Sequence, residues 1–207
     1  MLVNGPRDLP PRQRALRATL DWSHDLLDPA AQATFRRLAV CAGGFSTDAA
    51  IAICAVVGGE TAGQQADPLA PDDVAVAIEA LVDGHLLSLI EANGAGDEGA
   101  AVDGDEEGVP RLHMLATARA YALNRLSAAG EEAWMRRVHA DHYLTFAEGA
   151  AGALTGPEQA AWFMRIEQEY ANLRAALQWI WEAYDVARGL RLAGALWGVG
   201  VRAGNAA

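Results

Sequence analysis

The stretch RQRALRATLDWSHDLL, residues 12–27, decides how the rest of the chain is interpreted. Its spacing predicts a helix, because residues at steps of four, three and four fall on one helical face. That face contains Leu16, Leu20, Ser23 and Leu27. Trp22 and Leu26 are expected to widen it. The stretch therefore predicts an amphipathic helix that needs a partner for its apolar side.

Two helix-start signals follow this stretch. Asp28 is a predicted N-cap with Pro29 at the first helical position, and Ser46 is a predicted N-cap for a third helix. The second helix is expected to bury Phe35, Leu38 and Ala39, and the third to bury Ala49, Ala50, Ile53 and Cys54. Arg36 and Arg37 are expected to turn outward from the second helix.

A fourth helix and a hairpin are predicted next. The helix begins at Pro71, closes at Gly84, and has an apolar face formed by Val74, Ile78, Leu81 and Val82. Residues 86–91 are apolar enough for a strand, and residues 111–115 supply its expected partner. The intervening segment 91–109 has too much charge and glycine to pack, so we expect it to be an extended, mobile loop.

The last third of the chain has helical spacing throughout. Helices are predicted over residues 117–126 and 131–151, followed by one long helix over 162–184. Asp185 is the predicted N-cap of a final helix. The chain is therefore expected to be mainly α-helical, with one small β-hairpin.

Four ordered strings resemble one family, the bacterial STAND/NB-ARC-type signal-transduction ATPases, which include LuxR-like transcriptional regulators. TLDWSHDLL resembles the family's TLDWSYDLL, FRRLAVCAGGF resembles FRRLAVFAGGF, ALVDGHLL resembles ALVDKSLL, and RLHMLATARAYAL resembles FRLLETVREYAL. The resemblance implies a linker at residues 1–11, a winged helix-turn-helix domain with a hairpin wing at 12–128, and the truncated start of a TPR-like helical repeat domain at 129–207.

The family also implies a role. Such a module is a non-catalytic regulatory element that packs against a nucleotide-binding core, and ATP or ADP is expected in that core, which lies outside this chain. Arg36, Arg37 and Arg119 are the candidate interdomain contacts, although arginine pairs also commonly form solvated helix faces. A sensor motif of the plant relatives aligns with Met114, Leu115 and Ala116. Its histidine and carboxylate are missing here, so no cofactor is expected to bind this chain.

Composition narrows the function further. The chain has 207 residues, a formal net charge of −11, and no lysine among its 16 basic residues. A P-loop needs a lysine for the nucleotide phosphates, so we expect no enzyme activity in this chain. His139 and His142 have the spacing of a metal-binding pair but no third ligand, so no metal site is expected. No apolar run is long enough for a membrane span, and a cytoplasmic chain is expected.

Two other functions remain open. A stand-alone winged-helix DNA-binding protein would insert its fourth helix into DNA, but DDVAVAIEALVD contains four acidic residues and no basic one. DNA is therefore not expected to be a partner of this domain. A TPR-like interaction module would instead bind a protein partner through the Trp-rich helices of residues 157–197.

Overall fold

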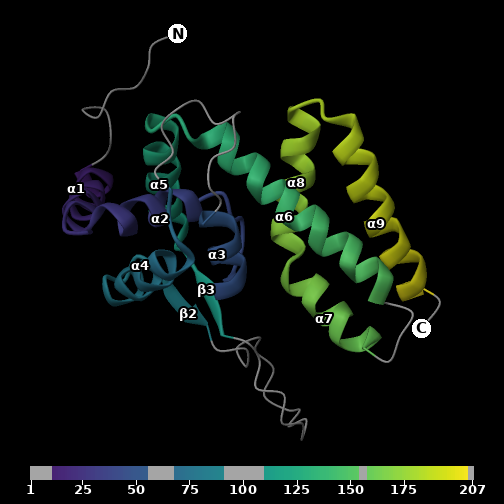
Figure 1. Cartoon of the computed structure of the whole chain (residues 1–207). Helices are drawn as coiled ribbons and strands as arrows, with labels where there is room; N and C mark the ends of the chain where they lie inside the picture. Colours follow the sequence, from purple (N-terminus) through teal and green to yellow (C-terminus); the bar gives the residue numbers. More distant parts are fainter. Residues whose placement is uncertain (1–10, 56–67, 91–109, 154–157, 205–207) are drawn as a thin grey trace, which may run out of the picture.

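The computed structural model describes residues 11–55, 68–90, 110–153 and 158–204 (Figure 1). The predicted linker, most of the loop after the third helix, the acidic loop 91–109 and the turn at 156–157 lie outside the described residues. The N-terminal elements are α1 (Pro11–Asp25), α2 (Pro29–Leu38), β1 (Phe45–Ser46), α3 (Thr47–Cys54), α4 (Pro71–Asp83), β2 (Ser88–Ile90), β3 (Arg111–His113) and α5 (Ala116–Ala128). The C-terminal elements are α6 (Glu132–Ala153), α7 (Gln159–Gln168), α8 (Tyr170–Glu182) and α9 (Val186–Gly204).

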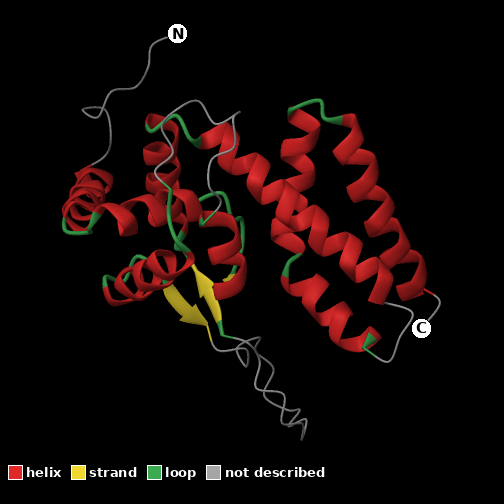
Figure 2. Cartoon of the chain, in the orientation of Figure 1, coloured by secondary structure: helices red, strands yellow, loops and turns green. Residues whose placement is uncertain are grey.

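The elements α2, β1, α3, α4, β2 and β3 follow one another in the order of a winged helix (Figure 2). The strands form an antiparallel sheet in the order β1-β3-β2, in which Leu112 pairs with Phe45 on one side and Leu89 on the other. The mainly helical fold with its small hairpin is therefore confirmed. The sequence did not predict β1, because a strand of two residues is too short to show alternation.

Local sequence signals set the starts of α2, α3 and α9. An Asp28 carboxylate oxygen accepts a hydrogen bond from the Ala31 amide at 2.7 Å, and the Ser46 hydroxyl accepts one from Ala49 at 3.1 Å. Asp185 accepts a bond from the Arg188 amide in the same way. Each cap satisfies an amide that the first helical turn leaves without a partner. The three predicted N-caps are confirmed.

The predicted faces of α2, α3 and α4 form the core of the winged helix. The largest buried apolar side chains around its sheet are Phe35, Leu38, Phe45, Ile53, Leu81 and Leu112. One hydrophobic cluster continues from these residues to Leu173, Ile180 and Leu192 in the C-terminal helices. The domain boundary at residue 128 stays a prediction, but the cores on its two sides are continuous.

Three apolar residues predicted for this first helix are not buried. Leu16 is 42% exposed, and Trp22 and Leu26, the latter just after the end of α1, are each 66% exposed, so Trp22 and Leu26 do not widen the packed face. That face instead includes His24, whose ring centroid lies 6.2 Å from that of Phe35 and 5.9 Å from that of Tyr121. Helix α1 therefore packs against α2 and α5 through the side that contains His24.

The long helix predicted over residues 162–184 is wrong, since it is divided into α7 and α8 at Glu169. Glu169 has φ −93° and ψ 4°, outside the α-helical range. Its carboxylate turns inward to Arg111, whose guanidinium also donates to the Gln168 carbonyl at 3.3 Å. A tertiary contact therefore accompanies the break, and helical periodicity alone does not reveal it.

The sequence predicts Leu190, Ala193, Leu196 and Trp197 as the apolar positions of the final helix, but α9 packs mainly with other residues. Leu192 and Ala195 are its buried residues, whereas Leu190 and Trp197 are exposed. Within the described residues, no helix is both long and apolar enough to cross a membrane.

Candidate functional site

A buried ionic cluster joins the winged helix to the C-terminal helices. Glu131, which precedes α6 and is 4% exposed, accepts hydrogen bonds from Arg36 at 2.9 and 3.2 Å and from Arg37 at 3.2 Å. Arg37 also donates to the Cys54 carbonyl at 3.1 Å, and its guanidinium lies 5.4 Å from the centroid of the Trp134 ring. One carboxylate thus connects two arginines of α2 to the start of α6.

These contacts change how the predicted arginine interface is understood. The expectation that Arg37 faces outward is wrong, because its side chain is 0% exposed and paired inside the chain. Arg36 is partly buried in the same ion pair, and Arg119 donates to the Cys41 carbonyl at 2.6 Å. Contact with a partner domain stays a prediction for Arg36 and Arg119, whose partial exposure leaves room for it.

The pKa of Glu131 reflects this cluster. Burial by itself would raise its pKa, but the hydrogen bonds and positive charges of Arg36 and Arg37 outweigh burial and lower it below the ordinary value. Glu131 therefore stays ionised in the folded chain, and its negative charge compensates the buried positive charge of Arg37.

A second buried cluster lies where α7 meets α8. Arg111 of β3 forms an ion pair of 2.7 Å with Glu169, whose other oxygen accepts from the Tyr143 hydroxyl and the Asn172 amide, each at 2.8 Å. Asn172 also donates to the Gly44 carbonyl at 3.0 Å and accepts from the Ala42 amide at 2.8 Å. These bonds connect the sheet and the α2–β1 loop to α6 and α8, so the two parts of the chain meet through two separate polar clusters.

The degenerate sensor motif lies at the end of β3. Met114 is buried, Leu115 is exposed, and Ala116 begins α5. None of the three has an ionisable side chain. This part of the chain therefore contains a core residue and a helix start, with no group that titrates.

The two histidines of α6, His139 and His142, have different surroundings. His139 is 3% exposed, its ring lies 4.7 Å from that of Tyr143, and burial lowers its pKa to about 3 although contact with Asn172 opposes the shift. Burial also lowers the pKa of His142. Among the described residues, no three His, Cys, Asp or Glu side chains form a group that could hold a metal ion.

The exposed face of α1 is a candidate contact surface, which we call the α1 stripe. It consists of Ala15, Thr19 and Trp22 of α1 together with Leu26 in the turn that follows the helix, and all four are exposed. The helix behind it is held firmly: Asp21 accepts from the Tyr121 hydroxyl at 2.7 Å and from Arg125 at 3.1 Å. The α1 stripe is thus an apolar surface on a fixed helix.

The helix that precedes the wing is acidic at its surface. Asp72, Asp73, Glu79 and Asp83 of α4 are all exposed. Near this helix, Val76 of α4 and Leu89 and Ile90 of β2 are also exposed. A surface of carboxylates and apolar side chains repels the phosphates of DNA and suits contact with protein.

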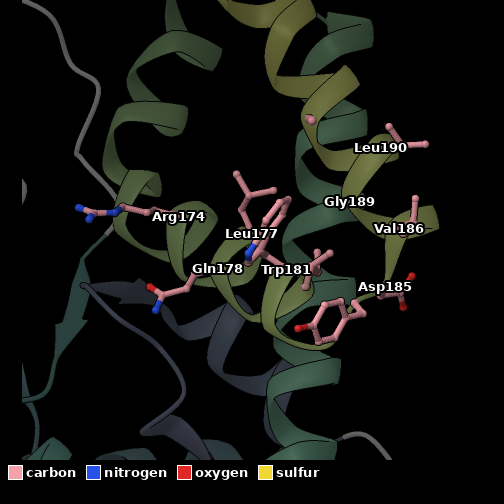
Figure 3. Close-up of a pocket in the computed structure, with 11 residues that line it drawn as sticks. Arg174, Leu177, Gln178, Trp181, Asp185, Val186, Gly189 and Leu190 are labelled. Atoms are coloured by element: carbon pink, nitrogen blue, oxygen red, sulfur yellow. The ribbon is translucent and has the colours of Figure 1, made fainter.

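A third surface is a groove of about 710 Å³ between α8 and α9, which we call the α8/α9 groove (Figure 3). Its lining is mostly apolar and includes Leu177, Trp181, Tyr184, Val186 and Leu190, with Arg174 at one end. Trp181 and Tyr184 are 83% and 89% exposed. Several large apolar side chains are thus gathered in one exposed groove, which makes it a candidate contact surface.

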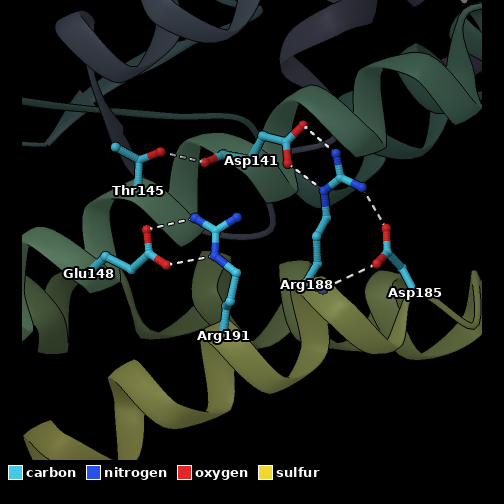
Figure 4. A network of polar contacts seen from close by, with 6 residues as sticks. All are labelled: Asp141, Thr145, Glu148, Asp185, Arg188 and Arg191. Carbon is cyan, nitrogen blue, oxygen red and sulfur yellow. Dashed lines mark hydrogen bonds and ion pairs between the residues drawn. The ribbon is translucent and has the colours of Figure 1, made fainter.

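Ion pairs hold α9 in place beside this groove (Figure 4). Arg188 bonds to Asp141 of α6 at 2.6 and 3.2 Å and also pairs with Asp185, while Arg191 bonds to Glu148 at 2.8 and 2.9 Å. These pairs lie on the side of α9 that faces α6. These ion pairs therefore fix the position of α9, which forms one wall of the α8/α9 groove.

Sequence reasoning missed the residues that connect the two parts of the chain. Glu131, Glu169 and Asn172 occupy ordinary helix-boundary or helix-face positions, and nothing in their spacing marks them. The adjacent pair Arg36 and Arg37 gives no signal either, because neighbouring residues are about 100° apart around a helix and can both lie on its exposed side. The partners, 94 and 95 residues away, are visible only in the fold.

Comparison with known proteins gives a coarse relationship. No family model and no solved structure matches the chain. Candidate HTH-type transcriptional regulators are similar to it: Mb0914c of Mycobacterium bovis and Rv0890c of Mycobacterium tuberculosis are each 34% identical over 196 residues. The match covers 95% of this chain and 19% of either relative. The chain is therefore homologous to a segment of large HTH-type regulators and spans about a fifth of their length.

Proposed function

We propose that the chain is a non-catalytic regulatory module that packs through the α1 stripe against the nucleotide-binding core of a STAND-type signalling regulator. The observation that carries the proposal is the 66% exposure of Trp22, on α1, and of Leu26, in the turn just after it, while the other face of the helix is packed. Such an apolar stripe favours burial against another protein surface, because removing it from water is favourable by roughly 25 cal/mol per Å².

The fixed position of α1 supports this role. Asp21, Tyr121 and Arg125 form a three-residue hydrogen-bonded set between α1 and α5, and Gln32 donates to the carbonyls of His24 and Leu27 at the end of α1. A helix that is already ordered loses little conformational freedom on binding, so more of the apolar contact appears as affinity.

The two buried clusters connect the winged helix to the C-terminal helices, so that the two parts move together. A displacement of α1 and α2 is transmitted to α6 through Glu131, and a displacement of the sheet is transmitted to α8 through Glu169. The module would therefore turn as one body when the core changes its nucleotide. Such a module biases a two-state equilibrium by having different contacts in the two states.

The surface of α4 weighs against the DNA-binding alternative. In winged-helix DNA binding, the helix before the wing enters the major groove and basic side chains contact phosphates. Here Asp72, Asp73 and Glu79 would approach those phosphates instead. We therefore assign this helix to protein contact, and we assign the ATP or ADP to the core outside the chain.

The test is titration calorimetry of the chain against a nucleotide-binding fragment from the same or a neighbouring polypeptide, with ADP and then with ATP. We expect binding whose affinity differs between the two nucleotides, and we expect Trp22→Ser with Leu26→Ser to abolish it. Trp181→Ser, which removes another exposed tryptophan, in the α8/α9 groove, is the matched control and should bind as the unmodified chain does.

Three outcomes would count against the proposal. Absence of binding with either nucleotide would exclude docking, and equal binding with both would exclude the switch. Unchanged binding by the Trp22 and Leu26 variant would exclude the α1 stripe. Replacing Arg36 or Arg37 is a poor test, because either change breaks the internal pair with Glu131. Salt-sensitive binding to duplex DNA would favour the alternative.

A further inference from the structure

The exposed face of α8 has the spacing of a coiled-coil seam. Its residues Tyr170, Arg174, Leu177 and Trp181 follow one another at steps of four, three and four. This is the pattern by which one helix inserts side chains between those of a second helix. All four are exposed, as is Tyr184 just after the end of α8, while the adjacent side of α8 buries Leu173, Ala176 and Ile180 in the core.

The groove beside this seam is shaped to receive a helix. Val186 and Leu190 of α9 form its second wall and are 69% and 71% exposed. Gly189 brings the two helices close together, since a Cβ there would lie 3.4 Å from a methyl group of Ile180. In Figure 3, Leu177 and Trp181 lie in the middle of the view, Val186 and Leu190 lie on the right, and Arg174 lies on the left.

We propose that the α8/α9 groove binds α8 of a second copy of this chain, in an antiparallel arrangement with two-fold symmetry. In this register, Leu177 of each copy packs against Trp181 of the other, and Arg174 of each packs against Tyr184 of the other. Each pair occurs twice, as an isologous interface requires. The inference concerns a different surface from the α1 stripe and does not depend on it.

The positive charge of Arg174 favours a second copy of this chain as the partner. Arg174 forms no ion pair or hydrogen bond with another described residue, and it lies at the opposite end of the seam from the aromatic pair Trp181 and Tyr184. Antiparallel pairing places the guanidinium over an aromatic ring, a favourable contact. The chain already uses such contacts, for example Arg165 at 5.2 Å from the centroid of the Trp162 ring. The seam of one copy therefore complements the seam of a second copy that runs in the opposite direction.

Sedimentation velocity of the full chain over a range of concentrations tests the dimer. We expect a concentration-dependent dimer, and we expect Trp181→Ser to weaken it by about 100-fold or more, because each dimer loses two central aromatic contacts. Trp181 is 83% exposed, so its replacement should leave the circular dichroism spectrum unchanged. Trp22→Ser removes an exposed tryptophan from α1 and should leave the dimer intact.

Cross-linking tests the register. Gln178 is exposed and flanks the seam near the proposed two-fold axis, so Gln178→Cys should form an intermolecular disulfide under mild oxidation. Asp48→Cys, exposed on α3, is the control and should remain monomeric on a denaturing gel. The chain's own Cys41 and Cys54 are buried and should not interfere.

Each experiment has an outcome that would overturn the proposal. A monomer at every concentration would exclude the second copy as the occupant and leave the groove for a different helix. A dimer that persists in Trp181→Ser would place the contact elsewhere. A Trp181-dependent dimer in which Gln178→Cys forms no cross-link would exclude the antiparallel register. Failure of the α1 stripe experiments changes none of these outcomes.

Discussion

Replacement of Glu131 by glutamine tests whether the winged helix and the C-terminal helices form one body. Glutamine keeps the shape of the side chain but removes the charge that compensates Arg37, which is fully buried. Leaving one member of a buried ion pair without its partner costs about 3–5 kcal/mol. Arg36 is partly exposed and can recover some solvation, so the lower half of that range, about 3–4 kcal/mol, is expected.

The assay is urea unfolding followed by both tryptophan fluorescence and far-ultraviolet circular dichroism. The expected loss of about 3–4 kcal/mol in the free energy of unfolding corresponds to a fall in melting temperature of about 10 °C for a chain of this size. Glu148→Gln removes a carboxylate from an exposed arginine pair of the same type and should leave the urea midpoint unchanged. If Glu131→Gln cost less than about 1 kcal/mol, the cluster would not hold the two parts together.

Three other changes have expected effects on stability. His139 stays neutral in the folded chain down to about pH 3, whereas in the unfolded chain it becomes protonated below about pH 6.5. The free energy of unfolding should therefore fall by about 1.4 kcal/mol per pH unit between these values. Urea titrations at pH 7 and pH 5 should show a smaller fall for His139→Phe. Asp28→Ala should cost about 1 kcal/mol in urea unfolding by removing the cap of α2, and a loss below about 0.3 kcal/mol would argue against the cap. Gly130→Ala, at φ +72°, should cost about 1–2 kcal/mol, whereas Gly149→Ala, within α6 with open space around its Cβ, should stabilise by about 0.5–1 kcal/mol; melting curves giving both the same sign would contradict this.

Local interactions explain which parts of the fold were predictable. The N-caps at Asp28, Ser46 and Asp185 involve neighbours three residues away, so the sequence contains the whole interaction. The apolar faces of α2, α3 and α4 were likewise predictable, because helical spacing brings residues of one face together wherever the helix later packs. The hairpin followed from two apolar segments on either side of a charged loop.

Spacing could not decide which of several apolar faces would be covered. The stretch that contains Trp22 and Leu26 has apolar residues on more than one side, and the packing of α1 on α5 and α2 selected the side that contains His24. In the same way, α9 buries Leu192 and leaves Leu190 exposed. The candidate surfaces of this protein are those that packing left uncovered.

The sequence by itself determined the helical class, the starts of α2, α3 and α9 and the acidic surface of α4, because each depends on residues close together in the chain. The winged helix was implied by the family resemblance, and its strand β1 came only from the structure. Only the tertiary structure decided that Arg37 is buried, that α7 and α8 separate at Glu169, and that α8 and α9 enclose an apolar groove. The physical reason is that a buried charge must have a partner, and the partner of Arg37 is 94 residues away. Contacts at that separation form only when the chain folds.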